Sequence, residues 1–232
     1  MIDKELNYGR HIIEKFLRNC SNPGLIVDLG AGHGTDLETA KKIFPDASIH
    51  AVEIYKPYCD ELIHLGFTVH TIDIEKDVYP FNANSVDVII ANQIIEHLKE
   101  IFWVFHQASR ILKPGGSFII GVPNIAALHN RLLLLLGNQP TQLKNWSAHV
   151  RGWTKKDLLS FANNIFPGGY TLKEFGGSNF YPFPPAVSKP LANLFPNLAW
   201  GIFLRFEKAK EYNDEFIKYP VEKQLETKFY LG

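Results

Sequence analysis

The first 122 residues alternate short apolar runs with amphipathic stretches. The apolar runs have the length of β-strands and cover Leu25–Leu29, Ser48–Glu53, Phe67–Ile72, Val86–Ala91 and Ser117–Val122. Between them, apolar residues recur every three or four positions, as on one face of a helix, at residues 35–43, 56–65 and 97–112. This alternation predicts βαβ units and an α/β fold, a doubly wound, mostly parallel (Rossmann-like) sheet with helices on both faces.

The pattern outside this alternating region predicts further elements. An amphipathic helix is expected at residues 8–19, a leucine-rich helix at 125–136, a polar loop at 137–152, a helix after the N-cap residue Thr154, and strands near 171–175 and 200–206. Thr35-Asp36-Leu37-Glu38 has the form of a capping box that opens the helix at 35–43. Asn179–Pro196 is rich in proline and aromatic residues, so we expect no regular structure there, and the tail at 207–232 is left without a predicted element.

Composition narrows the class of protein. A chain of 232 residues with 46% hydrophobic and 21% charged residues is long enough for one large core, which excludes a disordered chain and predicts a single domain over 1–232. Cys20 and Cys59 are the only cysteines, which excludes a disulfide framework and a cysteine-based zinc site. The charged N-terminus does not resemble a secretory signal, and no apolar run is long enough for a transmembrane span, so a cytoplasmic protein is expected.

The net charge of zero is an average over two unlike halves. Residues 1–116 hold 11 basic and 16 acidic side chains, whereas residues 117–232 hold 13 basic and 8 acidic ones. The balance argues against bulk nucleic-acid binding. The basic segment at 117–173 suits an anionic ligand as well as it suits an ordinary solvated surface, and both interpretations stay open.

A glycine-rich loop carries the strongest functional signal. Asp28 lies two residues before the first of three alternating glycines, Gly30, Gly32 and Gly34, and the loop joins a strand to a helix. Glycines let the backbone turn sharply and let a ligand approach it, and the helix N-terminus supplies N–H groups for an anion. A dinucleotide-binding loop would need a small residue where Thr35 stands, which disfavours an NAD-dependent oxidoreductase.

Three further stretches follow the loop at characteristic spacing. The second strand ends on Glu53-Ile54, the third on Asp73-Ile74, and residues 86–98 and 110–116 form two more motifs around the fourth strand and before the fifth. Together with the glycine loop, these resemble the motifs of the class I S-adenosylmethionine-dependent methyltransferases over residues 20–125. Each acid could instead be an ordinary exposed carboxylate, and for Asp87, at a strand start, that is the interpretation we adopt.

The resemblance implies a fold, a cofactor and a set of binding residues. It implies a seven-stranded sheet whose last strand is antiparallel, with S-adenosylmethionine as the cofactor, a cofactor-binding core at 20–125 and acceptor-side helices, loop and lid at 126–200. Glu53 would accept the ribose hydroxyls and Asp73 the adenine amino group. The cofactor-binding residues so implied are Asp28, Gly30, Gly32, Gly34, Glu53, Ile54, Asp73, Ile74 and Asn92.

Methyl transfer from a sulfonium needs alignment and exclusion of water, and a base only where the acceptor must lose a proton. The candidate bases are His97, after Glu96 in the fourth-strand motif, and His149 in the basic loop, although either could be satisfied by a backbone group instead. Some hydroxyl methyltransferases carry Glu-x-x-Glu-His at this place and bind a divalent ion. Here Gln93 replaces the first glutamate, so no metal is expected.

The acceptor is expected on the basic side of the chain. Arg151 is the candidate partner for an anionic acceptor, with Asn124 and Trp153 as further substrate contacts. The aromatic segment 179–200 could form a lid, a peripheral membrane contact, a homodimer contact or a satellite core.

We therefore expect a methyltransferase acting at an oxygen of a small or lipid-linked acceptor by in-line displacement. The rival hypothesis is a non-catalytic, cofactor-binding partner subunit.

Overall fold

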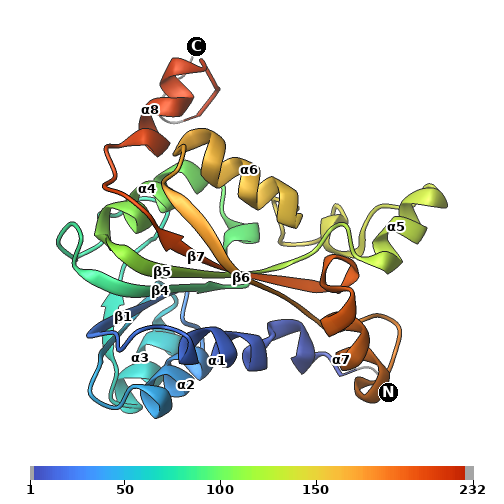
Figure 1. Cartoon of the computed structure of the whole chain (residues 1–232), viewed down its shortest axis with the longest axis horizontal. Coiled ribbons are helices and arrows are strands. Elements are labelled where there is room, and N and C mark those ends of the chain that lie inside the picture. The colour runs from blue at the N-terminus through green and yellow to red at the C-terminus, as the bar shows by residue number, and fades with distance from the viewer. Residues whose placement is uncertain (1–2, 228–232) are drawn as a thin grey trace.

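The computed structural model describes residues 3–227, and a seven-stranded sheet runs through the middle of the molecule (Figure 1). The strands are β1 (Leu25–Leu29), β2 (Ser48–Glu53), β3 (Thr68–Thr71), β4 (Val86–Asn92), β5 (Leu112–Pro123), β6 (Tyr170–Ser178) and β7 (Gly201–Lys208). Their order across the sheet is β3-β2-β1-β4-β5-β7-β6, and β7 alone runs antiparallel to its neighbours. The predicted sheet, with its antiparallel last strand, is confirmed.

Helices cover both faces of the sheet, as the alternating pattern predicts (Figure 1). They are α1 (Arg10–Arg18), α2 (Thr35–Ile43), α3 (Lys56–His64), α4 (Ile101–Ile111), α5 (Leu128–Leu135), α6 (Lys155–Ile165), α7 (Pro185–Leu194) and α8 (Glu215–Glu222). Apolar residues of α1, α2 and α3 share one core cluster with inward residues of β1, β2 and β4, and those of α4, α6 and α8 share the other. The chain thus crosses from one face to the other between α3 and α4.

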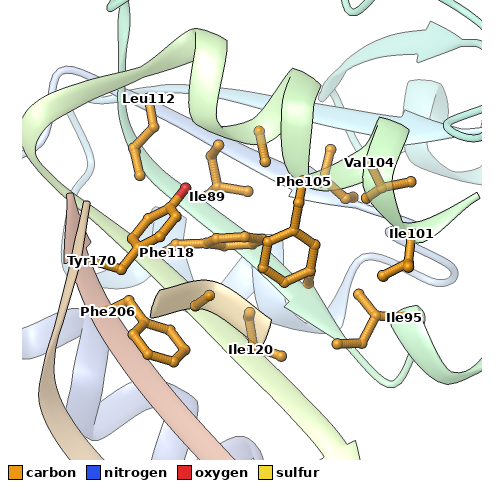
Figure 2. Close-up of a cluster of buried hydrophobic side chains, with 14 of the residues drawn as sticks. Ile89, Ile95, Ile101, Val104, Phe105, Leu112, Phe118, Ile120, Tyr170 and Phe206 are labelled. Carbon is orange, nitrogen blue, oxygen red and sulfur yellow. The ribbon is translucent and has the colours of Figure 1, made fainter. Parts of the chain in front are cut away.

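The larger core cluster shows why this half is rigid (Figure 2). Phe105 of α4 packs on Phe118 of β5, with ring centroids 5.5 Å apart, and both side chains are about 1% exposed or less. Tyr170 of β6 joins them and shares a hydrogen bond of 2.8 Å with the Ser109 hydroxyl, so its buried polar end is satisfied. Close packing of this kind fixes the position of β4, whose carboxyl end leads into the turn that carries His97.

Two helix starts differ from the sequence-based expectation. The helix predicted at 97–112 begins at Ile101, and residues 95–97 form a separate 3-10 turn, so His97 lies outside α4. The predicted capping box is wrong: Gly34, in the left-handed conformation, is the N-cap of α2, and no side chain caps the helix. Thr35 has already entered the helix because the glycine ends the loop one residue earlier. The N-cap Thr154 is confirmed, since its hydroxyl accepts the Asp157 N–H at 3.1 Å.

The segment Asn179–Pro196 is regular, contrary to the prediction, because it contains α7. Pro185 opens this helix, where its fixed φ and missing N–H are compatible with the first turn. Phe180 and Ala192 pack with Ala199 in a satellite cluster that also includes Leu128 of α5. The satellite core was one of the interpretations left open, and α7 is joined by it to α5.

The beginning of the tail is also structured. Residues 207 and 208 complete β7, and α8 buries Phe216 in the larger core cluster. The last part of the predicted tail, residues 228–232, lies outside the described residues. Across residues 3–227, every helix is too short or too polar to cross a bilayer.

Candidate functional site

The strand order reverses between β1 and β4, because the connections leaving their carboxyl ends go to opposite faces of the sheet. In open α/β sheets, ligands bind in the crevice at such a switch point. A pocket of about 230 Å³ lies there. It is lined by Tyr8, Arg10, Asp28, Gly30, Ala31, Gly32, His33, Thr35, Asp36, Tyr58, Asn92 and Gln93. Four of the predicted site residues, Asp28, Gly30, Gly32 and Asn92, thus meet at one place, and Gly34 follows in the same loop.

The glycine loop forms one wall of this pocket. Gly32 has φ +52°, a left-handed backbone, and a Cβ added to it would find no atom within 4 Å. Gly30, at φ +71°, is different, since a Cβ there would lie 2.8 Å from the Ile94 side chain. Gly32 therefore leaves open space in which a ligand can touch the main chain, whereas Gly30 permits close packing behind it.

Glu53 is held at the end of β2 by main-chain donors. Its carboxylate accepts the N–H of Gly32 at 3.0 Å, of Ile54 at 2.9 Å and of Tyr55 at 2.8 Å. The side chain is 8% exposed. Because a carboxylate has about four acceptor positions, this arrangement fixes its direction and leaves acceptor capacity for a ligand hydroxyl.

A second acidic group lies deeper in the pocket. Asp28 is 3% exposed, and burial together with the nearby charges of Asp36 and Glu53 raises the pKa of its carboxyl well above the usual range. The Asn92 amide donates to Asp36 Oδ2 at 2.8 Å. Asp36 Oδ1 and Asn92 Oδ1 are buried and have no hydrogen-bond partner among the described residues. Two orphaned acceptors beside buried acids are suited to a ligand ammonium group.

The chain just after β3 presents a polar residue, Asp73, followed by an apolar one, Ile74. Asp73 accepts the Glu75 N–H at 2.9 Å and the Lys76 ammonium at 2.7 Å. Ile74 is buried, whereas Ile54 on the neighbouring loop is 59% exposed. An exposed apolar side chain beside acceptor groups suits contact with a flat base. Contact of Asp73 with the adenine amino group stays a prediction.

Eight of the twelve lining residues were not among the predicted site residues. Three of them lie within the glycine loop or directly after it, and the others are Tyr8, Arg10, Asp36, Tyr58 and Gln93. Tyr8 and Arg10 come from the N-terminal segment, which was assigned only as a helix. The Tyr8 carbonyl accepts from the Asn92 amide at 3.0 Å, which ties that segment to the end of β4. No motif connects residues so far apart along the chain, and a charged residue just before an amphipathic helix was the only signal available.

A second group of side chains lies just beyond the pocket, where β4 leads into the 3-10 turn. Glu96, His97 and His149 each present one polar atom, and these atoms all lie within 4.8 Å of one another. The two imidazole rings are edge to face with centroids 4.7 Å apart. The structure therefore brings together both predicted catalytic histidines, although 51 residues separate them.

Hydrogen bonds determine which nitrogen of each ring carries the proton. His97 Nδ1 lies 3.2 Å from the Ala148 carbonyl, and His149 Nδ1 lies 3.0 Å from the Gln142 carbonyl. A carbonyl oxygen can only accept, so both Nδ1 atoms donate, and in a neutral ring Nε2 keeps its lone pair. Burial, with the charge of His97, lowers the pKa of His149, which favours that neutral ring.

The Glu96 side chain has fewer hydrogen-bond partners than the side chains of His97 and His149. It is 2% exposed, and neither carboxylate oxygen has a hydrogen-bond partner within residues 3–227. Burial raises the pKa of Glu96 to about 8. Its main-chain carbonyl accepts the N–H of Val150 at 2.9 Å and of Arg151 at 3.1 Å, which fixes the loop carrying His149 against the turn carrying His97.

Part of the chain matches a known protein family. Residues 27–120 match the family model described as a methyltransferase domain. The matched segment contains the glycine loop, Glu53, Asp73 and the end of β4. Residues 27–120 are therefore similar to a methyltransferase domain, and the chain has the fold of the S-adenosylmethionine-dependent methyltransferases.

Relatives agree with this assignment. A methyltransferase of Strobilurus tenacellus, str2, is 29% identical over 114 residues, which are 47% of this chain and 41% of that protein. The chain spans less than half the length of the curated relatives it matches. The plantazolicin methyltransferase BpumL, solved with S-adenosylhomocysteine, shares the fold at a TM-score of 0.61 and 16% identity, with 89% of this chain and 86% of that chain covered. A Burkholderia thailandensis 1,6-didemethyltoxoflavin-N1-methyltransferase, also solved with S-adenosylhomocysteine, gives 0.59 and 15%, covering 90% and 80%.

S-adenosylmethionine is the cofactor of this methyltransferase family, and the pocket residues fit it. The orphaned acceptors of Asp36 and Asn92 suit its ammonium group, Arg10 suits its carboxylate, and Glu53 suits its ribose. The open backbone at Gly32 leaves room between them.

The three predicted acceptor contacts have different surroundings. The Asn124 side chain is 1% exposed and is occupied by main-chain partners, donating to the Asn197 and Ala199 carbonyls at 2.9 and 3.0 Å and accepting the Ala126 N–H. Its position supports a role in ordering the chain after β5. Asn124 lines a separate pocket of about 290 Å³ together with Arg131 and Lys155, but its polar atoms there already have main-chain partners.

Arg151 and Trp153 are better placed than Asn124 for contact with an acceptor. Both line a pocket of about 500 Å³ whose other walls include Phe102, Phe161 and Tyr219. The Arg151 guanidinium donates to the Leu98 and Lys99 carbonyls at 3.0 and 2.7 Å, which holds its plane. The Trp153 indole N–H is buried without a partner among the residues described, and it is an unused donor in a pocket whose lining also includes Asp157, Ser160 and Asn164.

The cluster of Glu96, His97 and His149 offers three atoms that could hold a metal ion. The expectation of no metal rests on Gln93, which lines the cofactor pocket instead. His149 comes from a distant loop and was not part of the motif on which that expectation was based. The side chains present are thus compatible both with proton transfer and with a cation, and the two uses differ in their response to chelators.

Proposed function

We propose that this protein transfers the methyl group of S-adenosylmethionine to an oxygen of a small or lipid-linked acceptor. The observation that carries the proposal is the His149 ring, whose Nδ1 donates to the Gln142 carbonyl, so that its Nε2 lone pair is available beside His97 and Glu96. An acceptor hydroxyl must lose its proton as it is methylated, and a neutral imidazole is suited to take it. This chain therefore needs no external base.

The chain's own residues have separate tasks in the proposed reaction. S-adenosylmethionine, when bound, supplies a methyl group already activated by its sulfonium. Glu53 would hold the ribose of the bound cofactor and Asp36 its ammonium group, which would align the methyl group for in-line displacement. His149 Nε2 accepts the acceptor's proton, and His97 and Glu96 keep that ring in position. Asp28 lines the same pocket beside Asp36 and is proposed, with it, to face the cofactor.

The pocket lined by Arg151 and Trp153 supports an acceptor with an apolar part and a polar or anionic group. Aromatic walls bind the former, and a guanidinium held in one plane binds the latter. We also infer one domain over the chain, with the cofactor core at 20–125 and the acceptor side at 126–200. Two free thiols, Cys20 and Cys59, support a cytoplasmic location, where thiols stay reduced.

The decisive experiment measures label transfer from methyl-labelled cofactor into fractionated cell extract. We expect His149→Gln to lower the rate by at least about 100-fold while S-adenosylhomocysteine affinity stays unchanged, since the ring takes no part in cofactor binding. His64→Gln, at the exposed end of α3, is the matched control and should leave the rate unchanged. Cofactor binding without any transfer would favour the non-catalytic partner subunit.

Chelator treatment separates the two uses of the cluster. Proton acceptance by His149 predicts that activity survives dialysis against a chelator. Loss of activity that returns on adding Zn²⁺ or Mn²⁺, and not in the His149→Gln variant, would replace the base by a metal site.

A further inference from the structure

The structure presents an unusual apolar surface on α5 and the loop that follows it. We call residues 128–146 the leucine arm. Figure 1 shows α5 at one end of the molecule, apart from the helices that cover the sheet. Leu135 is 82% exposed, Leu136 is 74% exposed and Trp146 is 83% exposed, while Leu132 and Leu134 are each more than half exposed. Water contact of this extent for five large apolar side chains indicates a surface that is covered in use.

The charge around the leucine arm is of one sign. No aspartate or glutamate occurs between Glu100 and Asp157, whereas the arm itself carries Arg131 and Lys144. The Lys144 ammonium lies 5.5 Å from the centre of the Trp146 ring. A tryptophan beside lysine, next to exposed leucines, is the combination that anchors proteins at the headgroup level of a bilayer.

A second exposed strip lies at the same end. Leu194 is 72% exposed and Phe195 is 52% exposed at the end of α7. The two strips are connected, because the His129 ring of α5 lies 5.4 Å from the Tyr181 ring before α7, and Leu128 packs in the satellite cluster. Residues 175–206 likewise contain no acidic residue. The two apolar segments therefore carry a positive rim of Arg131, Lys144 and Lys189, beside the N-terminal segment, where the Asp3 carbonyl accepts from the Asn179 amide.

We propose that the leucine arm docks the protein onto an anionic membrane surface. Leu135, Leu136 and Trp146 insert between the lipid headgroups, and Arg131 and Lys144 contact their phosphates. The helix has eight residues, so it lies in the interface and does not cross the bilayer. Charge complementarity favours anionic lipid over a second copy of the chain, which would bring its own positive rim to the contact.

The leucine arm is continuous with the candidate active site. The Gln142 carbonyl in the arm accepts from His149 Nδ1, and the Gln142 side chain accepts from the Asn130 amide of α5 at 2.7 Å. Docking the arm therefore places the site at the membrane surface. A site at the membrane surface favours a lipid-linked acceptor over a free small molecule, a step that rests on the proposed function.

The test is co-sedimentation of the full chain with vesicles of phosphatidylcholine, with and without phosphatidylglycerol. We expect binding to the mixed vesicles, and a loss of at least about tenfold in partitioning for the double variant Leu135→Asp, Leu136→Asp. The matched control is Ile63→Asp, Leu65→Asp at the end of α3, far from α5 (Figure 1), where two exposed apolar side chains are replaced in the same way. Equal melting temperatures would show that all variants are folded.

Fluorescence gives a second, independent measurement. Vesicles should shift the emission of the parent protein to the blue, and Trp146→Phe should lose that shift because Trp146 is the tryptophan in the arm. The proposal is overturned if the parent protein does not bind anionic vesicles, or if the leucine substitutions leave its partitioning onto them unchanged. Sedimentation-velocity data showing an arm-dependent dimer that stays off vesicles would replace it by a homodimer contact. None of these readouts uses the cofactor, so failure here is distinct from failure of the proposed function.

Discussion

Two buried glutamates of this protein have opposite surroundings. Glu53 accepts three main-chain N–H groups, whereas Glu96 has no hydrogen-bond partner within the described residues. Donors stabilise a charged carboxylate, and burial without donors destabilises it. Glu53 is thus prepared as a fixed acceptor for a ligand, and Glu96 is prepared to hold a proton or to meet a positive charge.

The role of Glu53 leads to a binding prediction. Glu53→Gln keeps one acceptor oxygen for the loop but removes the charge that strengthens hydrogen bonds to the ribose. We expect S-adenosylhomocysteine affinity to fall by about tenfold or more, measured by calorimetry. Glu38→Gln, on the exposed face of α2, is the control. An unchanged affinity in Glu53→Gln would remove the ribose assignment.

The role of Glu96 leads to a prediction on stability and pH. A glutamate in the unfolded chain has a pKa near 4.5, and in the folded protein the pKa of Glu96 is raised to about 8. Between these values the folded protein keeps a proton that the unfolded chain releases. The free energy of unfolding should therefore fall as pH rises from about 4.5 to about 8, by an amount on the order of a few kcal/mol.

Glu96→Gln cannot titrate and should lose this part of the pH dependence. Denaturant unfolding at about pH 5 and about pH 8, in buffer containing a chelator, measures the difference between the variant and the parent. Parallel pH dependences would contradict an uncharged, unpartnered Glu96.

At the level of elements, local sequence was informative wherever an apolar pattern continued long enough. The strands β1, β2, β4 and β5 were predicted because their apolar runs face core on both sides of the sheet. Helix α7 was missed because proline at a first turn supports a helix, yet counts as a breaker in a sequence pattern. The start of α4 was missed because the 3-10 turn at 95–97 continues the apolar pattern of the helix.

One element allows a direct test of a predicted cap. The Thr154 hydroxyl accepts the Asp157 N–H at the start of α6. Thr154→Ala should lower the free energy of unfolding by about 1 kcal/mol, whereas Thr154→Ser should retain most of it, because serine keeps the accepting oxygen. Urea unfolding of both variants measures this. Equal losses in the two variants would show that the methyl group, not the cap, stabilises the helix.

At the scale of the whole molecule, cofactor binding should stabilise the fold. The pocket is assembled from the N-terminal segment, the glycine loop and the end of β4, so it exists only in the folded chain. At 100 times its dissociation constant, S-adenosylhomocysteine should add about 2.7 kcal/mol and raise the melting temperature by roughly 5–10 °C.

NAD at the same concentration is the control for this measurement. It should leave the melting temperature unchanged, because Thr35 stands where a dinucleotide loop needs a small residue. A shift with NAD and none with S-adenosylhomocysteine would contradict the cofactor assignment.

The strands, the glycine loop and the acids at the strand ends could be predicted because each depends on residues close together in the chain. Which distant residues meet depends on the folded arrangement. Folding brings Tyr8 and Arg10 to the pocket beside the glycine loop, brings His149 to Glu96 and His97, and leaves the leucines of α5 exposed. Burial and contact depend on the packing of all the elements. A leucine-rich helix therefore has the same sequence pattern whether it is covered or exposed.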